Sequence, residues 1–335
     1  MMHKFGQMPD GTEVHRIKLT GYGLVANVLT YGAVLQDLRL DGHEPSLVLG
    51  FEDFPSYLAH SPYFGATAGR YINRIRGGHF EIDGKAYQLD QNFLGKHCLH
   101  GGSIGIGKRV WNIEEHSDHA VTLSIIVADG EMGFPGELKV RAIFTLQPDH
   151  TLDIRYEATT DKPTLCNIGH HSYFNLDGGK SIVDHTLQVE ASQYTPVDDE
   201  LIPTGLVMDV DGTGFDFREP REVKFGGQGG IFDHNLCLSP VRENLRLVAT
   251  LHSPLSGVSM RINTTEAGLQ VYDGAKIDAP VPGLDGVEMG PRVGIAIEPQ
   301  VWPDSAHHEH FPQAILRPGQ QYVQQTQFAF TKATA

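Results

Sequence analysis

The chain has 335 residues, of which 40% are hydrophobic, and a formal net charge of −15. This composition is sufficient for a large core, whereas the acidic balance, with no run of five or more Lys or Arg, argues against a nucleic-acid partner. Because no apolar run approaches the roughly 18 residues of a membrane helix, and the start resembles no signal peptide, we also expect no membrane association.

The cysteines are odd in number and scattered along the chain. Cys98, Cys166 and Cys237 form no C-x-x-C pair. Such thiols are typical of reduced cysteines in a cytoplasmic protein, which is the location we expect. Both a monomer and a homodimer are compatible with the sequence.

Short alternating segments dominate the chain. Residues 54–60 predict one short helix, and residues 80–87 predict a hairpin with Asp83-Gly84 at its turn. Alternation of apolar and polar residues predicts strands over residues 121–127, 138–144, 152–156, 187–191, 245–251 and 258–262. The glycine-rich residues 225–230 predict a loop. Many short strands with frequent Gly and Pro indicate an all-β sandwich or barrel. Since no low-complexity linker divides the chain, we expect a single domain over residues 1–335.

A carboxylate follows a strand-like segment near the end of the chain. Residues 293–298 alternate, with one apolar face, and Glu298 would end the other face after Gly294 and Ala296. The small side chains would leave a gap in front of the carboxylate, and Pro299 would stop the strand. A general base and a solvated acid at a strand end are both compatible with this spacing.

Residues 167–176 combine ionisable, polar and aromatic side chains. If the segment is extended, His171 and Tyr173 share one face while His170 lies on the other. One histidine could then face a pocket while its neighbour faces the protein. The alternatives are a hydrogen-bonded structural pair and a zinc site that joins His170 to histidines of residues 307–310.

Further segments carry side chains suited to sugars. Asn73 and Arg74 offer fixed donors for hydroxyls or a developing oxyanion, and His100 precedes two glycines that allow close backbone approach. Asp233 follows a phenylalanine in a predicted loop. A surface arginine and an ordinary turn are the competing interpretations.

Residues 269–273 alternate, so that Gln270 and Tyr272 share a face. An amide beside an aromatic ring suits a sugar, although Tyr272 could equally pack in the core. No phosphate-binding loop, dinucleotide motif or serine-hydrolase elbow occurs in the sequence. What remains is acid/base chemistry on a polar ligand, without a cofactor.

Taken in order, these segments resemble the aldose 1-epimerases, or galactose mutarotases. The resemblance extends over nearly the whole chain and depends on several ordered motifs. They include Gly69-Arg70-x-x-Asn73-Arg74-Ile75, Leu99-His100-Gly101-Gly102, His171-Ser-Tyr-Phe-Asn-Leu176, Phe232-Asp233-His234, Gln270-Val-Tyr272 and Glu298-Pro-Gln300-x-x-Pro303-Asp304.

The resemblance implies a large antiparallel β-sandwich of the galactose-mutarotase type and an isomerase that needs no cofactor or metal. Its reaction would interconvert the α and β anomers of a free aldose by ring opening, rotation about C1–C2 and reclosure. The resemblance makes Glu298 the general base and His171 the general acid. The residues implied to bind or surround the sugar are Arg74, His100, Asp233, Gln270, Asn73 and Tyr272.

The resemblance also bears on the pKa of His171, on two departures from the family pattern and on alternative functions. We expect neighbouring carboxylates to raise the pKa of His171. Where the family often has asparagine, this chain has His170, and residues 305–310 also depart from the family pattern. We expect that loop to line the pocket entrance. A glycosidase that uses Glu298 and Asp233, and a non-catalytic sugar-binding module, are the alternative functions.

Overall fold

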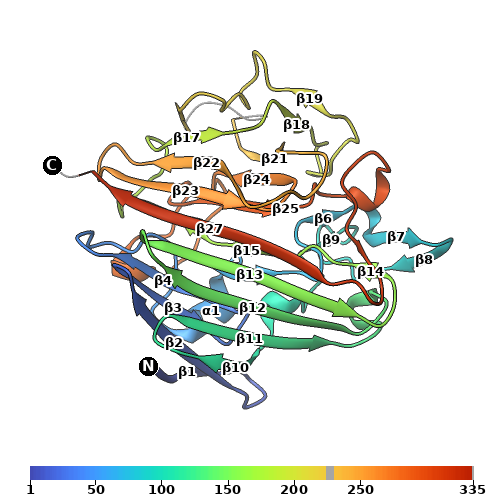
Figure 1. Ribbon diagram of the computed structural model, residues 1–335, viewed down its shortest axis with the longest axis horizontal. Coiled ribbons are helices and arrows are strands. Elements are labelled where there is room, and N and C mark those ends of the chain that lie inside the picture. Colours follow the sequence, from blue (N-terminus) through green and yellow to red (C-terminus); the bar gives the residue numbers. More distant parts are fainter. Residues whose placement is uncertain (224–229, 334–335) are drawn as a thin grey trace.

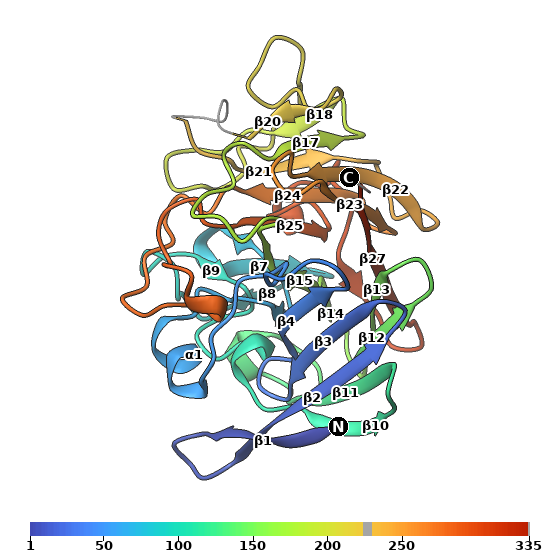
Figure 2. The same cartoon turned by 90° about the vertical axis from the view of Figure 1, so that its left-hand side faces the viewer.

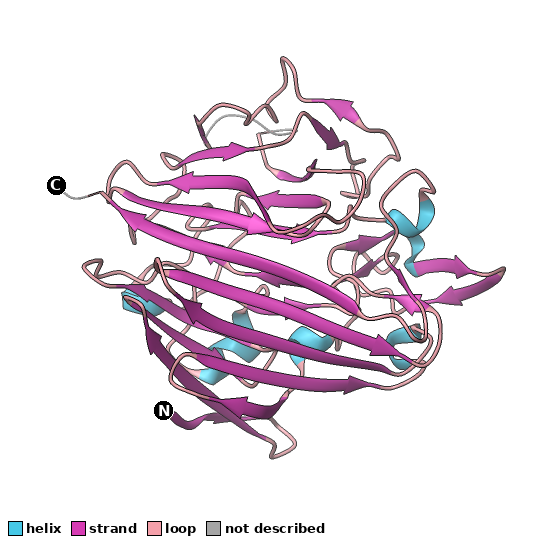
Figure 3. Ribbon diagram, in the orientation of Figure 1, coloured by secondary structure: helices cyan, strands magenta, loops and turns pink. Residues whose placement is uncertain are grey.

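Strands form most of the regular structure in this computed structural model, which describes residues 1–223 and 230–333 (Figures 1 and 3). Within those residues, two extensive antiparallel sheets, the large sheet and the second sheet, share the main hydrophobic core. The large sheet contains, in spatial order, β10 (Asn112–His116), β11 (Ala120–Val127), β12 (Leu138–Gln147), β13 (Thr151–Thr160), β27 (Tyr322–Lys332), β23 (Val258–Thr264), β22 (Arg246–His252), β17 (Thr186–Val189) and β20 (Arg221–Glu222).

The second sheet positions much of the site described below. It contains, in spatial order, β16 (Tyr173–Phe174), β25 (Ile295–Gln300), β24 (Gly268–Tyr272), β21 (Asp233–Cys237), β18 (Gln193–Thr195) and β19 (Met208–Asp209). The core includes Phe328 and Phe330 of β27 together with Ile295 and Ile297 of β25. Alternate residues of both sheets therefore supply one apolar interior, as in β-sandwiches.

An N-terminal sheet lies at one end of the molecule, opposite β17 and β18 (Figure 2). Its strands are β1 (Met2–Gln7), β2 (Glu13–Gly21), β3 (Leu24–Leu29) and β4 (Val34–Leu40). Shorter pairs complete the described strands: β5 (Ala66–Ala68) with β15 (Gly169–His171), β6 (Arg74–Ile75) with β9 (Cys98–Leu99), β7 (His79–Ile82) with β8 (Lys85–Gln88), and β14 (Thr164–Leu165) with β26 (Ile315–Leu316).

Helical segments are short. The α-helix α1 (Phe54–His60) begins where the Asp53 carboxylate accepts a hydrogen bond from the Ser56 backbone N–H at 2.9 Å, a typical N-cap. The remaining helical segments are 3₁₀ turns: η1 (Arg76–Gly78), η2 (Ile106–Lys108), η3 (Glu131–Gly133), η4 (Leu284–Gly286) and η5 (Ser305–His307). None of the helices in the described residues has the length and apolarity needed to span a membrane.

Most of the predicted elements are confirmed. The helix over residues 54–60 is α1, and the alternating segments correspond to β11, β12, β13, β17, β22 and β23. The predicted hairpin is β7–β8, in which Asp83 (φ 54°) and Gly84 (φ 75°) adopt the positive φ angles of a tight turn. The loop predicted over residues 225–230 lies almost entirely outside the described residues.

The prediction that the strand over residues 293–298 ends at Glu298 is wrong. β25 continues beyond Glu298, because Pro299 pairs with Leu269 of β24. On the other side of β25, β16 pairs only with Ile295 and Ala296. The missing N–H of Pro299 therefore falls beyond the β16 ladder, where a proline is tolerated within a sheet.

The predicted gap beside Gly294 is also absent. A Cβ atom on Gly294 would lie 2.7 Å from Leu49 Cδ1 and 3.1 Å from Tyr173 Cβ. Leu49, which is remote in sequence, fills the space that the glycine leaves. The open space in front of Glu298 is instead a cavity formed by several segments.

Candidate active site

Seven of the eight predicted site residues, from separate parts of the chain, line one cavity of about 250 Å³. They are Glu298, His171, Arg74, His100, Asp233, Asn73 and Tyr272. Strand pairing explains this arrangement: β25 pairs with β24 and β24 with β21, while β6 pairs with β9 immediately before His100. The volume is slightly below the ~300–1,000 Å³ of typical drug-sized sites, which suits a ligand as small as one sugar ring.

Glu298 and His171 face each other inside this cavity. His171 Nε2 lies 3.5 Å from Glu298 Oε1, and the two residues are only 4% and 2% exposed. Burial, reinforced by the charge of Asp233, raises the pKa of Glu298 well above its ordinary value. Burial also lowers the pKa of His171 to about 4. These opposite shifts favour a pair that holds a single proton over a wide pH range.

The expected rise in the pKa of His171 is therefore wrong. Asp233 does act in the predicted direction, but the loss of water around the imidazole outweighs it. Two polar atoms of the pair, Glu298 Oε2 and His171 Nδ1, are buried without a hydrogen-bond partner among the described residues. Buried polar atoms are normally paired, so both atoms are available to a ligand.

Arg74 and Asp233 form the most closely paired part of the cavity wall. Arg74 Nη2 lies 2.9 Å from Asp233 Oδ2, and Gln270 Nε2 donates to Asp233 Oδ1 at 2.7 Å. Asn73 Oδ1 accepts from the Arg74 backbone N–H at 2.9 Å, and the guanidinium lies over the Phe93 ring. Asp233 is thus held as a fixed acceptor at the cavity surface. Gln270 itself does not line the cavity and contacts Asp233 from behind.

His100 is positioned as a neutral donor. Its Nδ1 accepts a hydrogen bond from the Asn73 backbone N–H at 3.2 Å, so the proton of the neutral ring lies on Nε2. Burial, together with the nearby His171 and Arg74, lowers the pKa of His100 well below its ordinary range. The His100 ring meets that of His171 edge to face, with 5.2 Å between centroids.

Comparison with known proteins identifies the family. Residues 15–329 match the family model described as aldose 1-epimerase. The chain belongs to the aldose 1-epimerase family. It is 38% identical to galactose mutarotase of Bos taurus over 340 residues, which covers 98% of each protein. It is 33% identical to aldose 1-epimerase of Escherichia coli K12 over 340 residues, or 96% of each.

Solved structures agree with this assignment. The GalM/aldose epimerase homologue from C. elegans superposes with a TM-score of 0.89 at 31% identity, covering 95% of this chain and 99% of that one. The galactose 1-epimerase from Lactobacillus acidophilus gives a TM-score of 0.86 at 26% identity, with 100% and 99% coverage. The predicted galactose-mutarotase fold is confirmed.

Several residues that line the cavity of this aldose 1-epimerase family member were missed in the sequence. Tyr63 contacts both histidines, with its ring centroid 4.5 Å from that of His100 and 5.9 Å from that of His171. The other lining residues that were not among the predicted site residues are Pro62, Phe93, Leu99, Tyr173, Leu201 and Lys276. Most lie on loops that carry no periodic pattern, and the only available signal for Tyr63 was an aromatic residue just after the predicted helix. Tyr272 does line the cavity, as predicted.

His170 and residues 305–310 lie elsewhere. His170 Nε2 is 2.7 Å from Ser172 Oγ, and its ring packs near Phe144 and Phe328 on the core side of β15. The expectation that residues 305–310 line the entrance is wrong, because none of them borders this cavity. The loop turns instead around the buried Asp304. In the described part of the chain, no group of three or more His, Cys, Asp or Glu is arranged to hold a metal ion.

Proposed function

We propose that this protein is an aldose 1-epimerase, an isomerase that interconverts the α and β anomers of free aldoses of the galactose and glucose type. The observation that carries the proposal is the Glu298–His171 pair, 3.5 Å apart and buried in a cavity the size of a sugar ring. Arg74, His100 and Asp233 supply the surrounding hydrogen-bonding groups. Membership of the family supports the same activity.

The pair would move two protons in each ring opening. The Glu298 carboxylate removes the proton of the C1 hydroxyl while protonated His171 donates a proton to the ring oxygen. The bond from C1 to the ring oxygen breaks, leaving a carbonyl at C1 and a hydroxyl at C5. C1 then rotates about the C1–C2 bond, and closure on the other carbonyl face returns both protons. Each positioned acid or base typically contributes about 10²–10⁴-fold.

The proton count of the pair is the same before and after ring opening. The ionised pair, Glu298 carboxylate and His171 imidazolium, becomes a neutral acid and a neutral imidazole. The pKa shifts of the two groups favour that neutral form in the buried cavity. Burial therefore favours the proton transfers that accompany ring opening and, to the same extent, opposes their reversal on reclosure.

Fixed donors and acceptors would complete the chemistry. The Nε2–H of His100 and the guanidinium of Arg74 can stabilise negative charge that develops on the ring oxygen. Asp233, held by Arg74 and Gln270, would accept a hydrogen bond from a sugar hydroxyl. The same two contacts leave Asp233 poorly placed to protonate a leaving group, so we do not propose a glycosidase.

We also propose that residues 1–335 form one domain, which is supported by a family match over residues 15–329. A cytoplasmic location is supported by Cys98, Cys166 and Cys237, all buried free thiols. Whether the protein is a monomer or a homodimer stays a prediction.

Polarimetry of freshly dissolved α-galactose tests the function. The rate at which the optical rotation reaches its equilibrium value should increase in proportion to the concentration of the wild type. Glu298→Gln should abolish this acceleration. Glu288→Gln, the same substitution at an exposed glutamate, is the matched control and should retain it. A wild type without acceleration, or an active Glu298→Gln, would refute the proposal.

A further inference from the structure

A second cavity, of about 300 Å³, adjoins the active-site cavity. The residues that line both cavities are Leu201, Asp233, Tyr272 and Lys276. The second cavity is also lined by Asp198, Asp199, Ile231 and His234. Its volume is similar to that of the first, and its wall combines apolar and hydrogen-bonding groups. It therefore has the size and chemistry for a second sugar ring.

Leu201 belongs to a closed loop of residues 197–203. The loop is tied at its base by a bridge between Val197 and Pro203, and the Leu201 backbone N–H donates to the Asp198 carbonyl at 2.9 Å. Leu201 has a φ of 62°, in the left-handed region that disfavours a branched apolar residue. Glycine or asparagine would fit this backbone more easily. A leucine at this disfavoured backbone position, beside two cavities, points to a role for its side chain.

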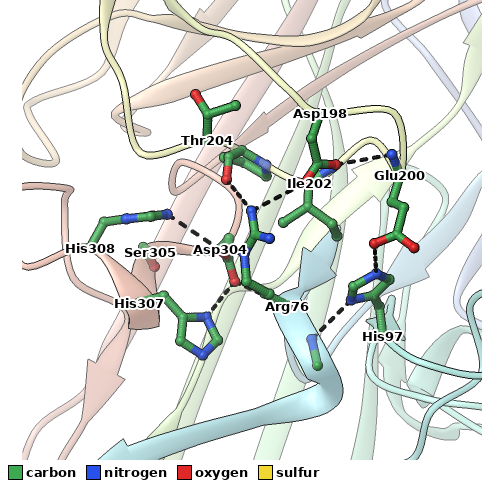
Figure 4. Close-up of polar contacts among 12 residues, drawn as sticks. Arg76, His97, Asp198, Glu200, Ile202, Thr204, Asp304, Ser305, His307 and His308 are labelled. Atoms are coloured by element: carbon green, nitrogen blue, oxygen red, sulfur yellow. Dashed lines mark hydrogen bonds and ion pairs between the residues drawn. The ribbon is translucent and has the colours of Figure 1, made fainter.

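Asp198 and Arg76 hold this loop from inside (Figure 4). Asp198 Oδ1 accepts from the backbone N–H groups of Glu200 and Ile202, each at 3.0 Å. Arg76 Nη2 lies 3.3 Å from Asp198 Oδ2 and donates to the Pro203 carbonyl at 2.9 Å. One guanidinium group thus contacts both ends of the short segment that contains Leu201.

Glu200, the residue before Leu201, is held from a different part of the chain. Its carboxylate lies 2.6 Å from Lys96 Nζ and 3.1 Å from Nε2 of the fully buried His97. Because His97 Nδ1 accepts from the Gly77 backbone N–H at 2.9 Å, the Nε2 atom is the donor to Glu200 (Figure 4). Leu201 is therefore fixed on both sides by polar contacts.

The loop of residues 304–310 braces Arg76 from behind. Buried Asp304 accepts from the Arg76 backbone N–H at 2.8 Å and from His307 Nδ1 at 2.6 Å (Figure 4). His310 Nε2 lies 2.9 Å from the Gly205 carbonyl, just beyond the Leu201 loop. This histidine-rich loop does not border the active-site cavity. By holding Arg76, however, it helps to position Leu201, which does line that cavity.

We propose that Leu201 is a specificity-determining residue that packs against the sugar in the first cavity and separates it from the second. With Leu201 in place, a single aldose ring is favoured over a reducing disaccharide, whose second ring would need the second cavity. Arg76 is a positioning residue for Leu201. The inference depends on the proposed function, because it concerns the substrates of the same site.

The test compares kcat and KM for glucose, maltose and isomaltose, whose free C1 belongs to a glucose ring that is unsubstituted, 4-O-substituted or 6-O-substituted. Leu201→Ala should raise KM for glucose by about 10-fold, the effect of losing a modest apolar contact. It should leave kcat nearly unchanged, since Leu201 touches no reacting atom. The kcat/KM of at least one disaccharide, relative to glucose, should rise by a similar factor.

Companion variants separate this role from a structural one. Leu201→Asn suits the left-handed backbone, so it should keep the melting temperature and still shift the ratio toward disaccharides. Arg76→Lys should shift the ratio in the same direction, with no further shift when combined with Leu201→Ala. Leu206→Ala, at an exposed leucine outside both cavities, is the matched control and should behave as the wild type.

The outcomes distinguish the two proposals. A wild type that accelerates no anomer exchange removes the proposed function, and this inference with it. An active wild type whose disaccharide-to-glucose ratio is unchanged in both Leu201 variants overturns the inference alone. An equal shift in Leu206→Ala also overturns it, because the effect would then not belong to the residue between the cavities.

Discussion

The large sheet and the active-site cavity differ in how fully their buried polar atoms are paired. In the sheet region, the Tyr156 hydroxyl lies 3.0 Å from Thr67 Oγ1, and Thr264 Oγ1 lies 3.0 Å from Thr326 Oγ1. Gln324 of β27 donates from Nε2 to Thr326 Oγ1 at 2.9 Å, although its Oε1 is buried without a partner among the described residues. In the cavity, Glu298 Oε2, His171 Nδ1 and Arg74 Nε have no partner among the described residues. An unpaired buried polar group typically costs about 1–3 kcal/mol. The large sheet therefore pairs most of its buried polar atoms, whereas the cavity leaves several of its charged and ionisable groups unpaired, and so available to a ligand, at the expense of stability.

The largest expected effect separates chemistry from stability at His171. His171→Gln should lower kcat for galactose anomer exchange by about 10²–10⁴-fold, because the donor to the ring oxygen is lost. Thermal unfolding should change little, since His171 Nδ1 is unpaired and Nε2 lies 3.5 Å from Glu298. Polarimetry and calorimetry measure the two effects, with exposed His116→Gln as the control. A kcat within tenfold of the wild type would remove His171 from the mechanism.

The reverse result is expected in the large sheet. Phe328 of β27 is fully buried in the core between the sheets. Phe328→Ala should lower the free energy of unfolding by about 3–5 kcal/mol, through lost burial and the cavity that remains. At a temperature where the variant is folded, kcat per folded molecule should stay close to that of the wild type. Denaturant titration measures the loss of stability, and the rate of galactose anomer exchange measures kcat. A large loss of kcat in fully folded Phe328→Ala would contradict the separation of stability from chemistry.

The pH dependence of kcat/KM should reflect the proton count of the pair. As pH falls through about 4, the pKa of His171, the pair gains a second proton and the base is lost. As pH rises through the raised pKa of Glu298, the last proton is lost and no acid remains. We expect a plateau that extends well below the ordinary histidine pKa of 6.5. An acid limb centred near 6.5 would contradict this account.

A smaller effect is expected on the stability of Glu298→Gln. The unfolded chain releases the Glu298 proton near the ordinary pKa of 4.5, whereas the folded protein keeps it to higher pH. The contribution of Glu298 to the stability of the wild type therefore falls as pH rises between those two values, whereas His171, whose pKa is lowered, contributes in the opposite direction in both proteins. The variant lacks the Glu298 penalty, so its stability relative to the wild type should increase from pH 4 to pH 7 by at least about 1.4 kcal/mol, the value of one pKa unit. Melting temperatures across that range would test the sign, and a decreasing difference would be incompatible with the raised pKa.

The sequence was informative where the signal was local or repeated. Alternation over residues 138–144 predicted β12, because the period of a strand is visible in its own residues. Asp83-Gly84 predicted the β7–β8 turn for the same reason. The candidate pair of Glu298 and His171 came from ordered motifs along the chain, and the structure places these residues face to face.

The errors all concern packing between distant segments. Pro299 predicts a strand end wrongly because the short extent of β16 is not visible from residues 293–300. The space beside Gly294 is filled by Leu49, about 245 residues away. The direction of the His171 pKa shift is not predictable from the sequence, because its burial depends on rings such as Tyr63 from other loops. The proposed role of Leu201 depends on two cavities and on Arg76, so its neighbours in sequence give no signal of it.

The central claim is that Glu298 and His171 exchange protons with a bound aldose. The most direct measurement is the rate of α–β galactose exchange at equilibrium, by saturation-transfer NMR, with folded Glu298→Gln. The claim predicts a rate at least about 10²-fold below that of the wild type, while Glu288→Gln exchanges normally. Exchange by Glu298→Gln within tenfold of the wild type would contradict it.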